Sequence, residues 1–268
     1  MKDKAVLLTG ASSGIGRATA LLLARQGARL FLVARRGDLL RSLEDEVKKL
    51  GGAASSQVLD LSRSADVNTM VCAAHERLGR IDVLINNAAF GYFGTVENTP
   101  PELVREIFAL NFEAPMIAIQ RVIPIMRRQK AGHIINISSV AGKRGLPLTG
   151  IYSATKFAMN GLAEALRVEL KDSNIVVSNV YPAGTRTEFG DVIRTGDVTG
   201  TFKPLGHSQS AEEVAHAVVR CIHRPRIEVY PYWPGRLFAW ASTLAPSLVD
   251  AVVARSFRAR IIARKDGV

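Results

Sequence analysis

The sequence predicts an α/β fold built on one doubly wound parallel sheet of about seven strands. Short apolar runs alternate with longer stretches of helical periodicity along most of the 268 residues. Several of these runs are apolar throughout, as expected for parallel strands that are buried on both faces. A glycine-rich turn joins the first run to the first helical stretch, at residues 9–16. A single domain of this class accounts for the pattern.

Each apolar run is expected to form one strand, and each periodic stretch between two runs is expected to be helical. The expected strands are Ala5–Thr9, Arg29–Ala34, Ala54–Asp60, Val83–Asn86, His133–Ser138, Val176–Val180 and Ile227–Tyr230. The expected helical stretches are Ile15–Gln26, Leu39–Leu50, Ala65–Leu78, Pro101–Lys130 (two helices), Ile151–Lys171 and Ala211–His223. This alternation favours right-handed βαβ units, in which each helix packs back onto the sheet.

Composition bears on the number of domains. Hydrophobic residues make up 47% of the chain and charged residues 22%, which is typical of a globular protein and excludes wholesale disorder. No repeat or linker interrupts the pattern. We expect one domain over residues 1–232, followed by a C-terminal helical extension over residues 233–268.

The cysteine and histidine content argues against a metal site. Cys72 and Cys221 have neither the spacing of metal ligands nor that of a disulfide framework, and the five histidines are scattered. We therefore expect no metal and a reducing, cytoplasmic environment. The chain enters its first strand almost directly after Met1, so we expect no signal peptide.

The formal net charge is +11. Such a charge is compatible with nucleic-acid binding, with contact to an anionic membrane, or with attraction of a phosphate-rich cofactor. The basic residues are scattered along the chain and no long basic run interrupts the core pattern. We therefore expect no nucleic-acid partner.

The turn after the first strand has the composition of a phosphate-binding loop. Its residues are Thr-Gly-Ala-Ser-Ser-Gly-Ile-Gly, and the glycines allow tight turning and close approach of the backbone to a pyrophosphate. The spacing G-x3-G-x-G differs from the general dinucleotide fingerprint, and a purely structural corner would also favour glycine. The position on the first βα turn favours a dinucleotide. The candidate contacts are Gly10, Ser12, Ser13, Gly14, Ile15 and Gly16.

The end of the second strand bears on the choice between NAD(H) and NADP(H). Ala34 is followed by Arg35 and Arg36, with no carboxylate for a ribose 2′-hydroxyl. Their guanidinium groups could hold a 2′-phosphate, so the sequence predicts NADP(H) as cofactor. The alternative is a pair of solvated surface arginines. At the end of the third strand, before Leu61, Asp60 could bond the adenine amino group or serve as a turn or cap residue.

Tyr152 and Lys156 form the candidate chemical centre. They lie at positions i and i+4 of an expected helix, so the phenol and the ammonium can converge. A free tyrosine has a pKa of about 10, which a nearby ammonium and a cationic nicotinamide lower. Such a pair could otherwise be a surface contact without function. Ser139, which directly follows the expected strand His133–Ser138 and precedes Tyr152 by thirteen residues, makes the pattern specific.

These features together resemble the short-chain dehydrogenase/reductase family in its one-domain, NADP(H)-preferring form. The matching residues follow the order and spacing of the family: Thr9–Gly16, Asp60, Asn86–Ala89, Asn111, Ser139, Tyr152, Lys156 and Pro182–Thr187. The resemblance implies a Rossmann fold and an oxidoreductase that moves a hydride between nicotinamide and a carbonyl or alcohol. It also implies a homodimer or homotetramer.

The resemblance implies roles for individual side chains. Tyr152 is the general acid in carbonyl reduction and the base in alcohol oxidation, and Ser139 hydrogen-bonds the substrate oxygen. Lys156 lowers the pKa of the tyrosine and binds the nicotinamide ribose. Asn111 holds a water that links the lysine to solvent, and Thr187 bonds the nicotinamide carboxamide. Further cofactor contacts are expected at Asp60, Leu61, Asn87, Ala88, Pro182 and Thr185.

Three positions depart from the family pattern. Ala89 stands where the family has Gly, which is tolerable if φ is negative there. Ala183 follows Pro182 where the family has Gly, which puts the backbone path under the nicotinamide in doubt. Ser13 replaces a basic residue before the second glycine, so the preference for NADP(H) depends mainly on the two arginines.

The substrate pocket is expected to be apolar. Its walls are expected after Ser139, around Phe90–Phe93 and in the segment 184–210, which lacks a clear period and is predicted to be mobile. A hydrophobic carbonyl or alcohol substrate is the resulting hypothesis, although several of these residues could equally pack in the core. The candidates are Leu146, Pro147, Leu148, Phe90, Tyr92, Phe93, Phe189 and Phe202.

The last 35 residues are first apolar and then basic. Leu237–Ala254 carries one charge, Asp250, and the cations that follow alternate with apolar residues at helical spacing. Because Pro246 and Asp250 interrupt the apolar run, we do not expect a transmembrane helix. A basic amphipathic helix could lie on an anionic membrane surface. It could also cover the substrate mouth or pack on a second subunit, and these two roles are favoured.

Two other functions are alternatives. A non-catalytic NADP(H)-binding regulator could share the fold, although it would not need the proton donor formed by Ser139, Tyr152 and Lys156. A membrane-associated reductase of lipid-like ketones would combine the same chemistry with membrane contact through the C-terminal tail.

Overall fold

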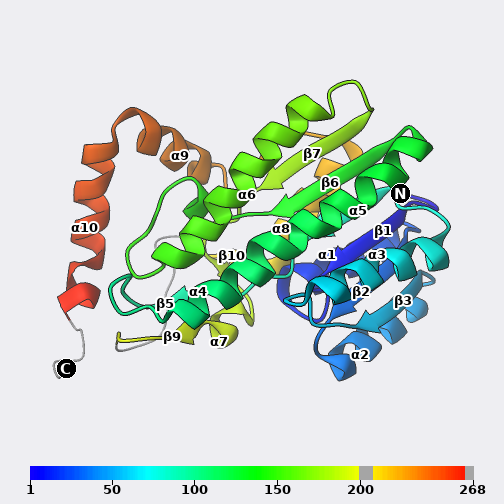
Figure 1. Ribbon diagram of the computed structural model, residues 1–268, viewed down its shortest axis with the longest axis horizontal. Coiled ribbons are helices and arrows are strands. Elements are labelled where there is room, and N and C mark those ends of the chain that lie inside the picture. Colours follow the sequence, from blue (N-terminus) through cyan, green and yellow to red (C-terminus); the bar gives the residue numbers. More distant parts are fainter. Residues whose placement is uncertain (199–207, 263–268) are drawn as a thin grey trace.

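The computed structural model describes residues 1–198 and 208–262 and has a seven-stranded sheet at its centre (Figure 1). All neighbouring strands of this sheet run parallel. Their order is β11 (Glu228–Val229), β7 (Ile175–Val180), β6 (Gly132–Ile137), β4 (Val83–Asn86), β1 (Ala5–Thr9), β2 (Arg29–Ala34) and β3 (Ala53–Val58). The direction of winding reverses between β1 and β4, which confirms the predicted doubly wound α/β fold.

Helices cover both faces of the sheet (Figure 1). One face carries α3 (Ser64–Leu78), α4 (Pro101–Phe108), α5 (Ala114–Gln129) and α6 (Gly150–Glu169). The other face carries α1 (Gly14–Arg25), α2 (Gly37–Lys49) and α8 (Ala211–His223). The long stretch predicted as two helices is α4 and α5, which a π-helical turn at Ala109–Glu113 connects.

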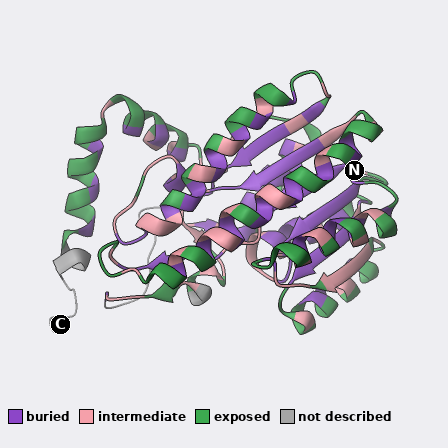
Figure 2. Ribbon diagram, viewed as in Figure 1, coloured by how far each residue is buried: buried purple, intermediate pink, exposed green. Residues whose placement is uncertain are grey.

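Each central strand sends alternate side chains into two hydrophobic cores. On β1, Leu7 packs in the core under α3, α5 and α6, whereas Val6 and Leu8 pack under α1, α2 and α8. Both faces are therefore buried, which explains why β1 is apolar at nearly every position. Figure 2 shows this arrangement, with buried central strands and exposed outer sides of the helices.

Strand ends differ from their expected positions by one or two residues. β3 ends at Val58 instead of Asp60, and β6 ends at Ile137, so that Ser138 lies just beyond the strand. β11 contains only Glu228 and Val229, the two central residues of the expected strand Ile227–Tyr230. β3 ends early because the Asp60 N–H donates to Asp66 Oδ2, at 3.0 Å, and not to the neighbouring strand.

The segment 184–210, predicted as a mobile break in the pattern, contains short regular elements in its described part. β8 (Thr185–Arg186) pairs with β10 (Gln209–Ser210), and β9 (Arg194–Thr195) pairs with β5 (Tyr92–Phe93). One helical turn, α7 (Phe189–Val192), lies between them. Two-residue strands are too short to produce a periodic signal in the sequence. The candidate pocket residue Phe202 lies outside the described residues.

The C-terminal extension forms two helices, α9 (Pro234–Leu244) and α10 (Pro246–Ile262). The break falls just before Pro246, whose ring suits the first turn of a new helix. α10 packs against the body of the molecule through Val249, Val253 and Phe257, which join Phe93 and Leu148 in a third hydrophobic cluster. None of the helices in the described ranges is sufficiently long and apolar to cross a membrane.

Candidate active site

A large cleft lies at the carboxyl ends of the parallel strands, around the switch point between β1 and β4. Its volume is about 720 Å³. Ligands of open parallel sheets bind at this edge, because the loops diverge there to opposite faces of the sheet. Most predicted site residues line the cleft, namely Gly10, Ser12, Ser13, Gly14, Ile15, Arg35, Arg36, Leu61, Asn87, Ala88, Ser139, Tyr152, Lys156, Pro182, Thr185 and Thr187. Gly16, Asp60 and Asn111 are outside this lining.

The glycine turn after β1 is bound to the end of β4. Asn87 Nδ2 donates to the carbonyl oxygens of Thr9 and Gly10, both at 3.0 Å. The backbone N–H groups of Asn87 and Ala88 donate to Thr9 Oγ1 at 2.9 and 3.0 Å. Gly10 has φ +65°, and a Cβ at Gly16 would lie 2.2 Å from the Gly10 oxygen. Gly16 therefore allows the close packing of the turn, although it does not line the cleft.

Arg36 folds onto this turn. Its Nη2 donates to Ser13 Oγ and, at 3.4 Å, to Ser12 Oγ, while Nη1 pairs with Glu188 at 2.7 Å. Arg35 is exposed at the same strand end. The cleft thus has two guanidinium groups and two hydroxyls beside the turn, a set of donors suited to an anionic group.

Asp60 is held by its own turn. Its Oδ1 accepts hydrogen bonds from the backbone N–H and the hydroxyl of Ser62, at 3.1 and 2.8 Å. Burial acts to raise the pKa of Asp60, but these bonds and the charges of Arg35 and Arg63 outweigh it and lower the pKa. The sequence allowed two interpretations of Asp60, as an adenine contact or as a turn or cap residue. The hydrogen bonds to Ser62 support a turn residue. Leu59 and Leu61 supply the wall of the cleft at this end.

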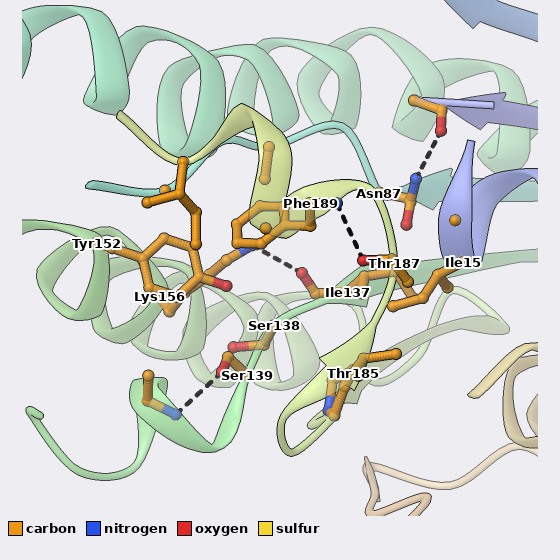
Figure 3. Close-up of a pocket in the computed structure, with 18 of the residues that line it drawn as sticks. Ile15, Asn87, Ile137, Ser138, Ser139, Tyr152, Lys156, Thr185, Thr187 and Phe189 are labelled. Atoms are coloured by element: carbon orange, nitrogen blue, oxygen red, sulfur yellow. Dashed lines mark hydrogen bonds between the residues drawn. The ribbon is translucent and has the colours of Figure 1, made fainter. Parts of the chain in front are cut away.

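Tyr152 and Ser139 approach each other at the other end of the cleft (Figure 3). Ser139 lies two residues beyond the end of β6, and its Oγ accepts a hydrogen bond from the Ala141 N–H at 3.1 Å, which caps a short 3-10 turn. Burial raises the pKa of Tyr152 to about 12, and a hydrogen bond with Ser139 acts in the opposite direction. The neighbouring Ser138 is buried and donates to Asn160 Oδ1 at 2.9 Å.

Lys156 lies beneath the tyrosine ring and is 4% exposed. Its Nζ donates to the Ile137 carbonyl at 2.9 Å and lies 5.6 Å from the centroid of the Tyr152 ring. Burial lowers the pKa of Lys156 to about 8. The chain's own residues do not lower the pKa of Tyr152 as expected, because the desolvation of the phenolate has the larger effect on this pKa.

Asn111 lies on the π-helical turn between α4 and α5, a feature often found at functional sites. Its side chain bonds both backbone groups of Phe90, donating to the oxygen at 2.9 Å and accepting from the nitrogen at 3.0 Å. Asn111 Nδ2 also lies 3.2 Å from Thr155 Oγ1, one residue before Lys156. The buried amide therefore ties the loop after β4 to the helix that carries Tyr152 and Lys156.

The segment after β7 folds across the cleft (Figure 3). The Cβ of Thr187 would lie 3.1 Å from a Cβ placed on Gly14, so this residue covers the glycine turn. Thr187 Oγ1 accepts from the Phe189 N–H at 3.1 Å, and the Phe189 ring centroid lies 5.8 Å from that of Tyr152. One short segment thus contacts both ends of the cleft.

The two alanines that replace family glycines are compatible with the backbone. Neither Ala89 nor Ala183 has a positive φ, so a Cβ introduces no backbone strain. The Ala183 N–H donates to Gln209 Oε1 at 2.9 Å, which fixes the chain where it leaves Pro182.

The apolar candidates divide between the cleft and the core. Leu146, Tyr92 and Phe189 line the cleft. Phe93 and Leu148 pack in the third cluster, under α10. Phe90 is buried, and both Phe90 and Pro147 are outside the cleft lining. The interpretation that these residues pack in the core therefore applies to part of the set.

Sequence reasoning missed a wall of the cleft that comes from the C-terminal extension. Pro234, Gly235 and Phe238 of α9 line this wall, together with Tyr232 just before the extension. The sequence allows the tail to be a membrane anchor, a cover for the substrate mouth or a contact with a second subunit. These contacts favour the second role. The i, i+3 spacing of Gly235 and Phe238 indicates a shared helix face, but no local signal shows which partner that face meets. Other missed lining residues are Ala34, Leu59 and Leu110, whereas Val140, Thr149 and Ile193 lie in segments that the sequence predicts to form walls of the pocket.

Comparisons with known sequences give a consistent result. A family model described as short chain dehydrogenase matches residues 4–197. An uncharacterized oxidoreductase of Staphylococcus saprophyticus is 36% identical over 228 residues, covering 84% of this chain and 92% of the relative. The mouse protein named dehydrogenase/reductase SDR family member 7B is 32% identical over 273 residues, covering 96% of this chain and 82% of the relative.

Solved structures with the same fold contain either nicotinamide cofactor. A metagenomic short-chain oxidoreductase in complex with NADP has a TM-score of 0.73 at 32% identity, covering 86% of this chain and 97% of that one. A short-chain dehydrogenase/reductase from Burkholderia phymatum in complex with NAD has a TM-score of 0.81 at 27% identity, covering 91% and 95%.

Proposed function

Because this chain belongs to the short-chain dehydrogenase/reductase family, we propose that it is an NADP(H)-dependent oxidoreductase of hydrophobic carbonyl or alcohol substrates. The family accounts for the oxidoreductase class and for a nicotinamide cofactor. One observation carries the rest of the proposal. Tyr152, Ser139 and Lys156 line one end of a cleft whose other end is formed by the glycine turn and two arginines.

The residues of the cleft fit a nicotinamide dinucleotide. Its volume of about 720 Å³ is in the range of cofactor sites. The turn presents Gly10 and Gly14 with positive φ at the start of α1, where backbone N–H groups bind phosphate. Lys156 would hold the ribose, and Thr187 the carboxamide, as the family resemblance implies. The bound cofactor supplies or accepts the hydride.

The side chains of the chain itself handle the proton. In carbonyl reduction, the Tyr152 hydroxyl donates its proton to the substrate oxygen, and in alcohol oxidation the phenolate accepts it. The Ser139 hydroxyl donates a hydrogen bond to the same oxygen and stabilises negative charge that develops there. The Lys156 ammonium, oriented by the Ile137 carbonyl, favours the phenolate that forms when the proton leaves. Asn111 is a positioning residue, because it acts through Phe90 and Thr155.

The preference for NADP(H) is supported by charge at the end of β2. Arg35 and Arg36 line the cleft there, and Arg36 already contacts the hydroxyls of Ser12 and Ser13. A 2′-phosphate would find donors in this arrangement. Among the described residues, no carboxylate lines the cleft to bind a ribose 2′-hydroxyl, and Glu188, which pairs with Arg36, is outside the lining. We expect a higher kcat/KM with NADPH than with NADH. Equal or better use of NADH would contradict the preference.

The substrate class follows from the walls near Tyr152. Leu146, Phe189, Ile193 and Phe238 form an apolar surround, and Tyr232 adds an aromatic side. Few polar side chains accompany them, so a carbonyl or alcohol with a bulky hydrophobic group fits this end best.

The test is a screen of aldehydes and ketones, in which loss of NADPH absorbance reports reduction. With the best substrate, Tyr152→Phe is expected to lower kcat by about 10²–10⁴ because it removes the proton donor. Affinity for NADPH, measured by fluorescence titration, should change little. The matched control is Tyr230→Phe, which removes a hydroxyl bonded to Glu228 outside the cleft lining and should retain activity. Full activity of Tyr152→Phe would reject the proposed acid.

A further inference from the structure

The helix α9 has two apolar faces. Gly235 and Phe238 face the cleft. The opposite face is formed by the "α9 ridge", which we define as Trp233, Leu237, Trp240 and Leu244. Their spacing of i, i+4, i+7 and i+11 places all four side chains along one side of the helix. They are 69%, 48%, 52% and 84% exposed, respectively.

The exposed apolar surface continues onto α10. Leu248 and Val252 are 68% and 59% exposed, while Val249 and Val253, one position further along, are buried against the body of the molecule. Among the described residues, six of the thirteen large exposed hydrophobic side chains lie within residues 233–252. Figure 2 shows the outer sides of α9 and α10 as exposed. So concentrated a patch marks an interaction surface, because isolated apolar residues would be spread over the molecule.

The identity of the aromatic residues is informative. The chain contains two tryptophans, and both are on the α9 ridge. Tryptophan is usually largely buried in a soluble protein. At the boundary between lipid and water it is favoured, because its ring is amphipathic.

The charge beside the ridge is positive. The Arg236 guanidinium lies 4.7 Å from the ring centroid of Trp240. Arg255 and Arg258 are exposed further along α10. In the sequence, residues 233–268 contain six basic and two acidic residues. One of the two acids, Asp250, is already paired with Arg144.

From these observations we infer that the outer face of α9 and α10 docks on an anionic lipid bilayer. An interfacial helix combines an exposed apolar stripe with flanking cations in this way. The exposed apolar side chains occupy one side of each helix, so the proposed contact is insertion of that side into the bilayer surface. A second copy of the chain fits less well, because a symmetric contact would bring the same cations together. The opposite face of α9 lines the cleft, so docking would place this wall of the cleft next to the bilayer.

The test uses the full-length protein and two kinds of vesicle, phosphatidylcholine alone and phosphatidylcholine mixed with phosphatidylglycerol. Because both tryptophans lie on the ridge, a blue shift of tryptophan emission reports insertion of this face directly. We expect the shift, together with co-sedimentation, with the anionic vesicles. Added salt should weaken both, since it screens the attraction of the arginines.

Matched variants separate the apolar contribution to vesicle binding from the electrostatic contribution. Leu237→Ser/Leu244→Ser keeps both tryptophan reporters and should reduce partitioning about tenfold or more. Its control is Leu39→Ser/Leu50→Ser, which changes two exposed leucines in and after α2. Arg255→Glu/Arg258→Glu should abolish the preference for anionic vesicles. Arg220→Glu/Arg224→Glu makes the same change of charge at the end of α8 and should retain that preference.

The result that overturns the inference is equally specific. It fails if the wild-type protein binds neither kind of vesicle, or if the control variants lose binding as much as the ridge variants do. It also fails if light scattering without lipid shows a dimer that protects the tryptophans from acrylamide and that Leu237→Ser/Leu244→Ser dissociates. In that case a second copy covers the face. All these readouts are independent of turnover, so they do not depend on the proposed reaction.

Discussion

At the scale of single residues, the buried cation Lys156 is expected to govern the response of the site to pH. Its side chain is 4% exposed, and burial lowers its pKa to about 8. An ammonium that loses its proton near this pH no longer stabilises the phenolate of Tyr152. The lysine therefore contributes its charge only below that value.

We predict that kcat/KM for carbonyl reduction falls as pH rises through about 8. The measurement is a pH profile with the best substrate from the screen, in buffers of constant ionic strength. Lys156→Met should be much less active and should lack this inflection. A wild-type profile that is flat across neutral and alkaline pH would disagree with the assignment.

The same ionisation affects stability. The unfolded chain keeps the lysine proton up to a pKa of about 10.5, whereas the folded chain releases it near 8. The unfolded state therefore binds more protons between these values, and the free energy of unfolding rises with pH across this window. Below pH 8 the buried charge lowers stability by up to about 3 kcal/mol. Lys156→Met should accordingly be more stable than the wild type at neutral pH in urea unfolding.

Glu188 is a second residue whose effect can be isolated. Its carboxylate binds Arg36 at 2.7 Å, at the place proposed for a 2′-phosphate. This carboxylate would compete with a 2′-phosphate for the guanidinium and would repel the phosphate.

We predict that Glu188→Gln lowers the KM for NADPH by up to about fivefold and leaves the KM for NADH unchanged. The effect is small because both partners are about half exposed. Glu102→Gln, an exposed carboxylate on α4 that pairs with Arg105, is the control. An equal effect on both cofactors would remove the argument for a 2′-phosphate at Arg36.

At the scale of elements, a ladder of asparagines crosses the sheet below the site. Asn86, Asn136 and Asn179 occupy paired positions on β4, β6 and β7. Their side chains form consecutive hydrogen bonds of 3.0 Å. Asn179 then donates to Asn160 at 3.3 Å, which also accepts from Ser138. The ladder thus links the register of three strands to the residue next to Ser139.

We predict that Asn136→Ala lowers the free energy of unfolding by about 2–4 kcal/mol, because it leaves the amide of Asn86 and the carbonyl of Asn179 buried without partners. Urea unfolding measures this change. Asn68→Ala, which removes a partly exposed bond to Arg121, should cost less than about 1 kcal/mol. Similar losses for the two variants would show that the ladder does not stabilise the sheet.

At the scale of the whole molecule, the C-terminal extension is expected to behave as a unit distinct from residues 1–232. Its α10 is attached through a small cluster in which Phe257 is 2% exposed. The cleft lining includes residues of α9 but none of the described residues of α10. Loss of this attachment should therefore leave the cofactor end intact.

We predict that Phe257→Ala, which forfeits about 3–5 kcal/mol of local packing, accelerates proteolysis within the extension and leaves the affinity for NADPH unchanged. Limited digestion with mass spectrometry locates the cuts. Leu248→Ala, on the exposed side of the same helix, should behave as the wild type. Loss of structure throughout the chain would contradict the boundary near residue 232. The predicted homodimer or homotetramer is a separate question for light scattering.

The sequence by itself determined the order of the seven sheet strands and their covering helices along the chain, the glycine turn and the helical spacing of Tyr152 and Lys156. These are local properties, because hydrophobic periodicity and i, i+4 geometry depend on neighbouring residues alone. Only the tertiary structure decided that Glu188 binds Arg36, that burial raises the tyrosine pKa, and that the start of α9 forms a wall of the cleft. Such contacts join residues far apart in the chain, and they follow from how whole surfaces pack, which no short window of sequence contains.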